Sequence, residues 1–428
     1  MGPGMPATDD DHLVALRRDL HRHPEPAWRE FRTTARVVEE LDRIGVEEVH
    51  VGPDALADAR LSVPDADDLA AWRTRAREAG VDADLLAAMD GGWTGCVAVL
   101  EQGEGPTVGL RVDIDGLPRE ESTDGDHVPA REGFRSETSA MHACGHDAHA
   151  TIGVGVLEAV TRSDFTGTLK VFFQPAEEVI GGGRAVVESG HLDDVDYLYA
   201  VHVGLDYPTG EVVAGVGDFL AVTQFHATFT GEPAHAGAAP EAGHNAVQAM
   251  ATAVTDLYGI PRHGDGDSRI NAGRVGGGTA SNIVPEEAFV QGEARGATTE
   301  IRDFVFDRAR QAMEGAALAH GCEVDVGVEG EAPSADSDDD LVDVVHAAAS
   351  DHPAVSRPTR RGSLGGSEDA TYLMQHVQDR GGHATYVGVG TDHPGGHHTA
   401  TFDVDETSIG IGVDVLSEAI VETSRSPP

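Results

Sequence analysis

The chain has 428 residues, of which 74 are acidic and 30 are basic, for a formal net charge of −44. Its length exceeds that of one ordinary hydrophobic core, so two domains are expected. The charge excludes nucleic acid as a partner, because phosphate binding requires a positive surface, and no apolar run approaches the roughly 18 residues of a membrane span.

At the start of the chain, residues 1–11 lack the basic segment of a secretory signal, so we expect a cytoplasmic protein. Apolar residues at helical spacing predict one helix from His12 to Gly45 and further helical structure from Asp54 to Met89. Short apolar runs, typical of buried strands, then follow at 96–100, 108–112 and 169–173. Helices are expected between and after them, at 151–160 and 183–188. This alternation is typical of an α/β domain with a largely parallel central sheet flanked by helices.

The pattern changes near residue 217. Strand, helix, strand, strand, helix and strand are expected at 223–230, 246–258, 270–275, 288–294, 301–319 and 323–328. This order is typical of a ferredoxin-like α+β domain. The acidic segment 329–340 is expected to be a linker, after which the α/β character resumes. We therefore expect a larger domain in two parts, 1–217 and 333–428, with a smaller domain inserted at 218–332.

The composition carries two further signals. Lys170 is the only lysine, and acids are spread along the whole chain. This spread favours a halophilic protein from a salt-rich cytoplasm, because the Debye length at molar salt is about 3 Å and self-repulsion becomes tolerable; an acidic ligand-binding surface is the alternative. The cysteines Cys96, Cys144 and Cys322 lie far apart and imply no disulfide framework. Cys96 and Cys322 are expected to be small core residues.

The densest cluster of polar side chains is the run from Met141 to His149, which holds three histidines, one cysteine and one aspartate. These side chains are soft and borderline ligands for a divalent transition metal. One residue separates Cys144 from His146, so a turn can direct both toward one ion. The alternative is a helix N-terminus capped by Asp147, which accounts for that aspartate but not for the clustering.

Expected strand ends add more ligands. Asp115 follows the strand at 108–112, Glu177 and Glu178 follow the strand at 169–173, and His202 lies in an apolar run. In an open α/β sheet the carboxyl ends of the strands face the ligand crevice. Acids there bind a metal, orient a ligand histidine or take a proton from water. A surface acid and a buried core histidine are the alternatives.

A glycine-rich stretch near the C-terminus holds the adjacent His397 and His398, of which only one is expected to ligate. Other motifs are missing from the sequence. It contains no dinucleotide fingerprint, no phosphate-binding loop that ends in Gly-Lys-Ser/Thr, and no Gly-x-Ser-x-Gly nucleophile elbow.

These motifs resemble the M20 metallopeptidase family, in its amidohydrolase branch, which includes hydrolases of indole-acetyl-amino acids and of hippurate. The likeness runs from the segment 17–21 through 367–369 to the C-terminal histidine pair. It implies a metal-dependent amidohydrolase that cleaves an N-acyl amino acid, of the p-aminobenzoyl-glutamate type or another. It also implies two divalent ions, Mn²⁺ or Zn²⁺, with Co²⁺ or Ni²⁺ as alternatives. The family fold pairs a catalytic α/β domain with an inserted lid domain that carries dimer contacts, which implies a homodimer or a heterodimer with a related chain.

The resemblance also implies a role for individual residues. Cys144 matches a thiolate that bridges two ions, and the other implied ligands are His146, Glu178, His202 and His398. His398 is chosen over His397 because the family places the ligand four residues before an aromatic, here Phe402. Glu177 matches the general base, and Asp115 matches the acid that orients ligands. In the inserted domain, His235 matches a residue that stabilises the oxyanion or binds the substrate carboxylate, and Asn282 and Arg295 resemble substrate contacts.

Two rival hypotheses remain at this point. One is a member of a hetero-oligomeric hydrolase that requires a sister chain for activity. The other is a metal-binding or storage protein without turnover. Glu177 argues against storage, because a storage site has no use for a base beside its ligands.

Overall fold

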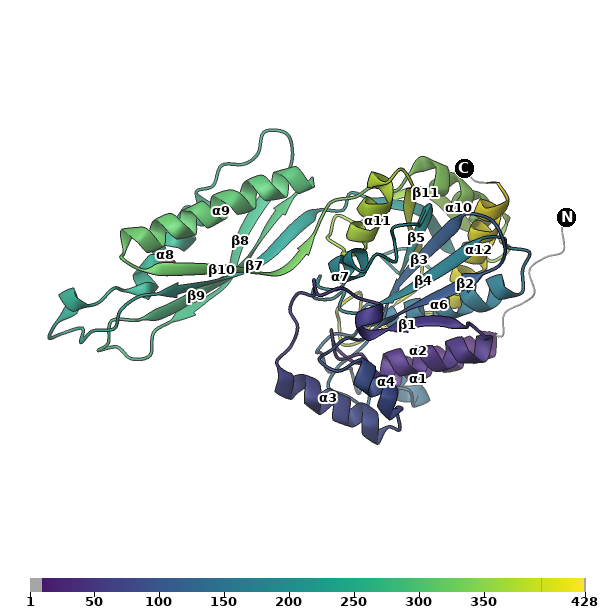
Figure 1. Ribbon diagram of the computed structural model, residues 1–428, viewed down its shortest axis with the longest axis horizontal. Coiled ribbons are helices and arrows are strands. Elements are labelled where there is room, and N and C mark those ends of the chain that lie inside the picture. Colours follow the sequence, from purple (N-terminus) through teal and green to yellow (C-terminus); the bar gives the residue numbers. More distant parts are fainter. Residues whose placement is uncertain (1–9, 394, 427–428) are drawn as a thin grey trace. The chain divides into compact units, whose positions relative to one another are not determined.

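The computed structural model describes residues 10–393 and 395–426 and divides them into two compact units (Figure 1). The larger unit holds the described residues up to Gly217, then Ala335–Leu364, and the described residues from Asp369 onward. The smaller unit holds Asp218–Ser334 and Gly365–Glu368. None of the described helices is long and apolar enough to cross a membrane.

The larger unit is built on an eight-stranded sheet with the order β1-β2-β4-β3-β5-β12-β6-β11. The strands are β1 (Glu48–Val51), β2 (Cys96–Glu101), β3 (Thr107–Asp113), β4 (Thr168–Gln174), β5 (Tyr197–Val203), β6 (Glu211–Gly217), β11 (Arg357–Ser363) and β12 (His383–Val389). The central strands β4, β3, β5 and β12 run parallel. The pairs β1–β2, β2–β4 and β6–β12 are antiparallel. The carboxyl ends of the four parallel strands therefore lie at one edge of the sheet.

Helices flank both faces of this sheet (Figure 1). The helices of the larger unit are α1 (Asp10–Arg22), α2 (Phe31–Ile44), α3 (Ala66–Glu78), α4 (Ala83–Ala88), α5 (Val128–Glu132), α6 (His146–Thr161), α7 (Gly183–Glu188), α10 (Asp339–Asp351), α11 (Ala370–Asp379) and α12 (Thr407–Arg425). Helices α3 and α4 pack on each other, and α3 packs on α2. Helix α6 packs on β3 and β5 and is covered by α1, α2 and α12. Helices α7 and α11 pack on each other and on β4, β5 and β12. The larger unit thus has the expected α/β class.

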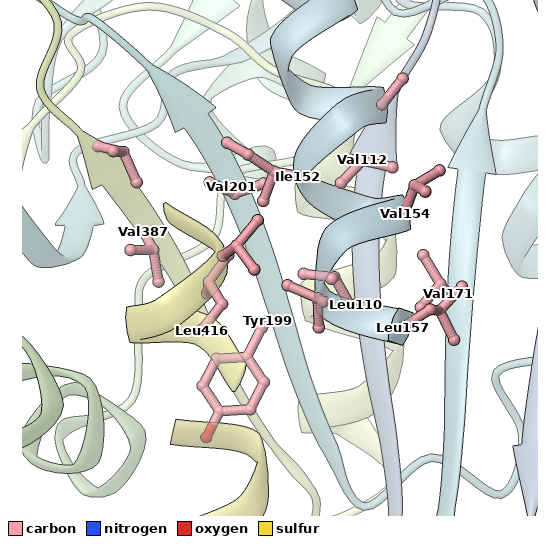
Figure 2. Packing of buried hydrophobic residues seen from close by; sticks show 14 of the residues in the cluster. Leu110, Val112, Ile152, Val154, Leu157, Val171, Tyr199, Val201, Val387 and Leu416 are labelled. Carbon is pink, nitrogen blue, oxygen red and sulfur yellow. The ribbon is translucent and has the colours of Figure 1, made fainter. Parts of the chain in front are cut away.

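The core between the sheet and α6 fixes the helix that begins at the predicted metal motif. Figure 2 shows Ile152, Val154 and Leu157 of α6 against Leu110 and Val112 of β3, all completely buried. Burying an aliphatic side chain of this size contributes about 1.5–3 kcal/mol. A Cβ on Gly153 would lie 3.0 Å from a methyl of Val112, so glycine lets the helix approach the sheet closely.

The helices expected at residues 12–45 and 54–89 are shorter than predicted. The single helix expected over residues 12–45 is two helices, because α1 ends at Arg22 and α2 begins at Phe31. Pro24 and Pro26 lie between them, and proline both removes a backbone donor and disfavours helix in the preceding residue. In the segment 54–89, only α3 and α4 are α-helical.

The smaller unit has the expected ferredoxin-like order of elements. These are β7 (Ala221–Thr230), α8 (Ala246–Tyr258), β8 (Ser268–Gly277), β9 (Glu287–Gly296), α9 (Thr299–Ala319) and β10 (Glu323–Ala332). The antiparallel sheet has the order β10-β7-β9-β8, and both helices pack on it. The linker expected at 329–340 was wrong at both ends. Strand β10 continues past a bulge to Ala332, still paired with β7, and α10 begins at Asp339.

Candidate metal centre

The five predicted metal ligands converge at the carboxyl edge of the central strands. The sulfur of Cys144 and ring nitrogens of His146 and His202 lie within 4.8 Å of one another. The same sulfur lies within 4.8 Å of a carboxylate oxygen of Glu178 and a ring nitrogen of His398. The two groups therefore share one thiol, which is the arrangement expected where a thiolate bridges two ions.

Unusual backbone conformations shape the loops that carry these ligands. Gly145 has φ +86° at the start of α6, and a Cβ there would lie 2.5 Å from a methyl of Val203. Ala176 (φ +59°), Ile180 (φ +51°) and His398 (φ +59°) are non-glycine residues in the left-handed region. Such positions cost about 1–3 kcal/mol each and persist only where the surroundings hold them. The loops are thus held in conformations that a relaxed chain would avoid.

Hydrogen bonds orient the rings of two predicted ligands. His146 donates from Nδ1 to Asp115 Oδ1 at 3.1 Å, and His202 donates from Nδ1 to the carbonyl of Val203 at 2.7 Å. In its neutral form each ring therefore has its Nε2 lone pair directed toward the cluster. The Nε2 atom of His146 is buried and has no hydrogen-bond partner among the described residues. A buried, unpartnered nitrogen beside a thiol and carboxylates fits a metal ligand, because buried polar atoms otherwise find partners.

Asp115 forms hydrogen bonds to two other parts of the cluster. Besides His146, its carboxylate accepts the backbone N–H groups of Glu177 and Glu178, at 3.2 Å and 3.1 Å. One buried acid thus holds both the ring of His146 and the turn that carries the two glutamates. The nearest oxygen of Glu177 lies 3.8 Å from His146 Nε2, so the predicted base faces the same cluster.

A second layer of polar residues was missed by the sequence interpretation. His149 contacts Asp113 through Nδ1 at 2.5 Å and accepts the backbone N–H of Val203 on Nε2 at 2.8 Å. Arg111 donates to the other oxygen of Asp113 at 2.7 Å. Both nitrogens of His149 are thus occupied, so it supports the site and is not a ligand. Its only sequence signal was its place in the motif 141–149.

Burial and neighbouring charges perturb the protonation of the cluster. Burial and the charge of Glu178 raise the pKa of the Cys144 thiol. Burial lowers the pKa of His146, but the charge of Asp113 and the bond to Asp115 outweigh it and raise that pKa well above its ordinary value. Burial and the charge of His149 lower the pKa of His202. Binding a metal here would displace protons from Cys144 and His146.

The sequence interpretation also missed a buried ionic network around Asp147, a residue of the motif 141–149. His21 contacts Asp147 Oδ2 through Nδ1 at 2.8 Å and Glu121 Oε1 through Nε2 at 3.0 Å. Arg17 lies 2.8 Å from Asp147 and 2.6 Å from Asp403. Asp147, first considered as a helix cap, therefore ties α6 to α1 and to the segment before α12.

The three substrate residues predicted in the inserted domain belong to the smaller unit. His235 is exposed, and its Nδ1 accepts the backbone N–H groups of Gly237 and Ala238, both at 3.1 Å. The proton of the neutral ring is therefore on Nε2. Asn282 is also exposed, and its backbone carbonyl accepts a hydrogen bond from the backbone N–H of Ala236.

Arg295 is already paired. Its Nε and Nη2 donate to the two oxygens of Glu293, each at 2.9 Å, and its Nη1 donates to Ser367 at 3.2 Å. A substrate carboxylate would have to compete with Glu293 for this guanidinium.

Comparison with known proteins gives consistent relatives. The model of the peptidase family M20/M25/M40 matches residues 109–422. The chain is 43% identical to the indole-3-acetyl-aspartic acid hydrolase of Enterobacter agglomerans, over 95% of this chain and 94% of that protein. It is 42% identical to one of the subunits of the p-aminobenzoyl-glutamate hydrolase of Escherichia coli (strain K12), with the same coverage. The crystal structure of an aminobenzoyl-glutamate utilization protein from Klebsiella pneumoniae superposes with a TM-score of 0.84, at 35% identity and 97% coverage of both chains.

Proposed function

The chain belongs to the peptidase family M20/M25/M40 and is a metal-dependent amidohydrolase of N-acyl amino acids, and we propose that it releases aspartate or glutamate from an aromatic acyl group. Two similar hydrolases, at 43% and 42% identity, are named for indole-3-acetyl-aspartate and p-aminobenzoyl-glutamate. Both of these substrates join an aromatic acyl group to an acidic amino acid. Such identity over 95% of the chain supports a substrate of the same type.

We propose that Cys144, His146, Glu178, His202 and His398 hold two divalent ions, with Cys144 shared. The observation that carries this proposal is the membership of Cys144 in both ligand groups. Ions in two-metal hydrolases lie about 3.5–4 Å apart, which suits ligand atoms gathered so closely. Bound there, the ions would lower the pKa of a coordinated water and polarise the acyl carbonyl. Thiolate, imidazole and carboxylate suit Zn²⁺, and Mn²⁺, Co²⁺ and Ni²⁺ remain alternatives.

Glu177 is proposed as the general base and acid. Its carboxylate takes a proton from water as the water oxygen attacks the acyl carbon. It then delivers that proton to the nitrogen of the departing amino acid as the C–N bond breaks. The products are the free acid and the free amino acid. Asp115 supports this role because it holds the backbone of Glu177 in place.

We further propose that His235 donates from Nε2 to the developing oxyanion. The tautomer fixed by its two backbone contacts supports this, since it leaves the N–H on the outer side of the ring. Asn282 and Arg295 are proposed as substrate contacts. The inserted domain would complete the site by closing over the substrate or by reaching into a partner chain. We also propose that the chain forms a homodimer, or a heterodimer with a related chain. We place it in a salt-rich cytoplasm.

A hydrolysis screen tests the proposal. The purified chain, in molar KCl with Mn²⁺, Zn²⁺, Co²⁺ or Ni²⁺, would be offered p-aminobenzoyl-glutamate, indole-acetyl-aspartate, hippurate and N-acetyl-alanine. We expect the first two to be cleaved with the highest kcat/KM. Preference for N-acetyl-alanine would contradict the substrate class. Activity only after a related chain is added would favour the hetero-oligomeric alternative.

A further inference from the structure

The two adjacent histidines after β12 meet the ligand cluster at different atoms. His398 lies 3.5 Å from a carboxylate oxygen of Glu178 through Nε2. His397 lies 3.5 Å from the sulfur of Cys144 through Nδ1. Proximity alone would allow either ring to be a ligand. The hydrogen bond on the other nitrogen of His397 distinguishes them.

The backbone N–H of Leu205 donates to Nε2 of His397 at 3.0 Å. A neutral imidazole carries one proton, and a nitrogen that accepts a hydrogen bond does not carry it. The proton of His397 is therefore on Nδ1, the atom that faces the sulfur. His202 reaches the same sulfur at 3.4 Å with the opposite tautomer, because its Nδ1 donates to a carbonyl. Two rings thus face one sulfur, one with a lone pair and one with an N–H.

The protein fixes the ring of His397 in this orientation. Its centroid lies 4.8 Å from that of Phe402 and 5.0 Å from that of His393. A Cβ at position 204 would lie 2.6 Å from Nε2 of His397, so Gly204 leaves the space that the ring occupies. These contacts hold the ring with its Nδ1 toward the sulfur.

We propose that His397 is a positioning residue that donates a hydrogen bond to the Cys144 thiolate and is not itself a metal ligand. This inference rests on the proposed ligand set. A hydrogen bond to a ligating sulfur withdraws electron density from it, so the sulfur donates less to the metal. The metal then remains a stronger Lewis acid, which favours hydrolysis.

The test uses the full chain loaded with Co²⁺, whose thiolate-to-cobalt absorption band reports electron donation by the sulfur. His397→Phe, and the smaller His397→Val, remove the N–H. His397→Asn places an amide N–H near the position of Nδ1. We expect two Co²⁺ per chain in all three variants, a shift of the band to longer wavelength in the first two, and its restoration in the third.

Loss of one Co²⁺ in His397→Phe and His397→Val would make His397 a ligand and overturn the inference. An unchanged band at full metal content would also overturn it. His398→Ala tests the proposed function separately, since it should lose one ion. Two ions retained in His398→Ala would refute the ligand set without bearing on the bond between His397 and the sulfur.

A second inference comes from an unpaired cation. Arg119 is exposed, and among the residues that the structure describes its side chain forms no ion pair or hydrogen bond. The backbone of Leu117 pairs with Met141, three residues before Cys144, and Ser122 donates to the carbonyl of Ala400 in the loop that carries His398. The segment with Arg119 is therefore tied to metal-ligand loops on both sides.

The backbone ties of Leu117 and Ser122 thus place the segment of Arg119 beside the loops of Cys144 and His398. Arg295, the cation predicted from the sequence for the substrate carboxylate, is bound by Glu293. Arg119 has no such competitor among the residues that the structure describes.

We infer that Arg119 binds the side-chain carboxylate of the leaving aspartate or glutamate. This inference also rests on the proposed function. A guanidinium suits a carboxylate because it can donate two parallel hydrogen bonds. It would also offset locally the repulsion between an anionic substrate and a chain with a net charge of −44.

Conjugates of one aromatic acyl group with glutamate and with alanine test this inference. Arg119→Gln should raise KM for the glutamate conjugate roughly 10–100-fold, as for a lost charged hydrogen bond, and leave the alanine conjugate unchanged. Arg119→Lys should recover part of the loss. Arg131→Gln, a change at an exposed arginine that contacts Glu132, is the control. Equal effects on both conjugates, or none, would refute the assignment, whereas a wild-type chain that cleaves neither would refute the proposed function instead.

Discussion

Replacing His21 by glutamine should change the pH dependence of stability. The ring is completely buried between Asp147 and Glu121. Burial and the charge of Arg17 lower its pKa, but the bonds to the two carboxylates outweigh them and raise it from 6.5 to about 9. A pKa raised by this amount corresponds to about 3 kcal/mol of stability. That contribution is fully present below pH 6.5, where the unfolded ring is also protonated, and is lost as the pH rises toward 9.

The assay is urea unfolding of wild type and His21→Gln at pH 6 and pH 9. The decrease in the free energy of unfolding from pH 6 to pH 9 is compared between the two proteins, and it should be larger in wild type. Burial also raises the pKa of Glu25 to about 7 and of Glu30 to about 8. These carboxyls likewise reduce stability as pH rises, but they do so in both proteins, so the difference isolates His21. His23→Gln, at a more exposed histidine next to the same helix, is the matched control. Equal losses in wild type and His21→Gln would refute the reasoning.

Four further outcomes are expected. Glu177→Gln should keep both metals and lose most turnover, whereas Glu178→Gln should lose metal; metal analysis with the opposite result would reverse the two roles. His235→Ala should lower kcat by about 10²–10³, as for one lost oxyanion donor, with metal content and oligomeric state unchanged, and near-normal kcat would reduce the inserted domain to an assembly element. Gly145→Ala should weaken metal binding in titration calorimetry, because its φ of +86° and the nearby Val203 leave no room for a Cβ; unchanged affinity would contradict this. The melting temperature should rise steeply from low to molar KCl as surface repulsion is screened, and an unchanged value would refute the halophilic interpretation.

Much of the larger unit followed from local pattern. The runs at 108–112 and 169–173 lie within β3 and β4, and the polar residues just beyond them lie at the carboxyl edge of the central strands. Two features made this prediction reliable. Buried parallel strands are continuous apolar runs, and the carboxyl ends of such strands face the ligand crevice.

The second layer of the site could not be predicted in this way. Asp113 and His149 are 36 residues apart, and their contact depends on how α6 packs over β3. The tautomers of His202 and His397 depend on backbone groups that no spacing in the sequence specifies. Sequence pattern therefore identified candidate ligands, and packing determined how their atoms are presented.

The acids of this chain act in two physically different ways, and salt separates them. Exposed carboxylates repel one another through solvent, so molar KCl should reduce their cost. The carboxylates of Asp147 and Glu121 are buried against His21, where mobile ions do not enter and screening is weak. The pH-dependent loss of stability that disappears in His21→Gln should therefore be similar at low and molar KCl, even where total stability changes greatly. If salt abolished that difference, the network would be exposed to solvent in solution, and the large pKa shift of His21 would not describe the folded protein.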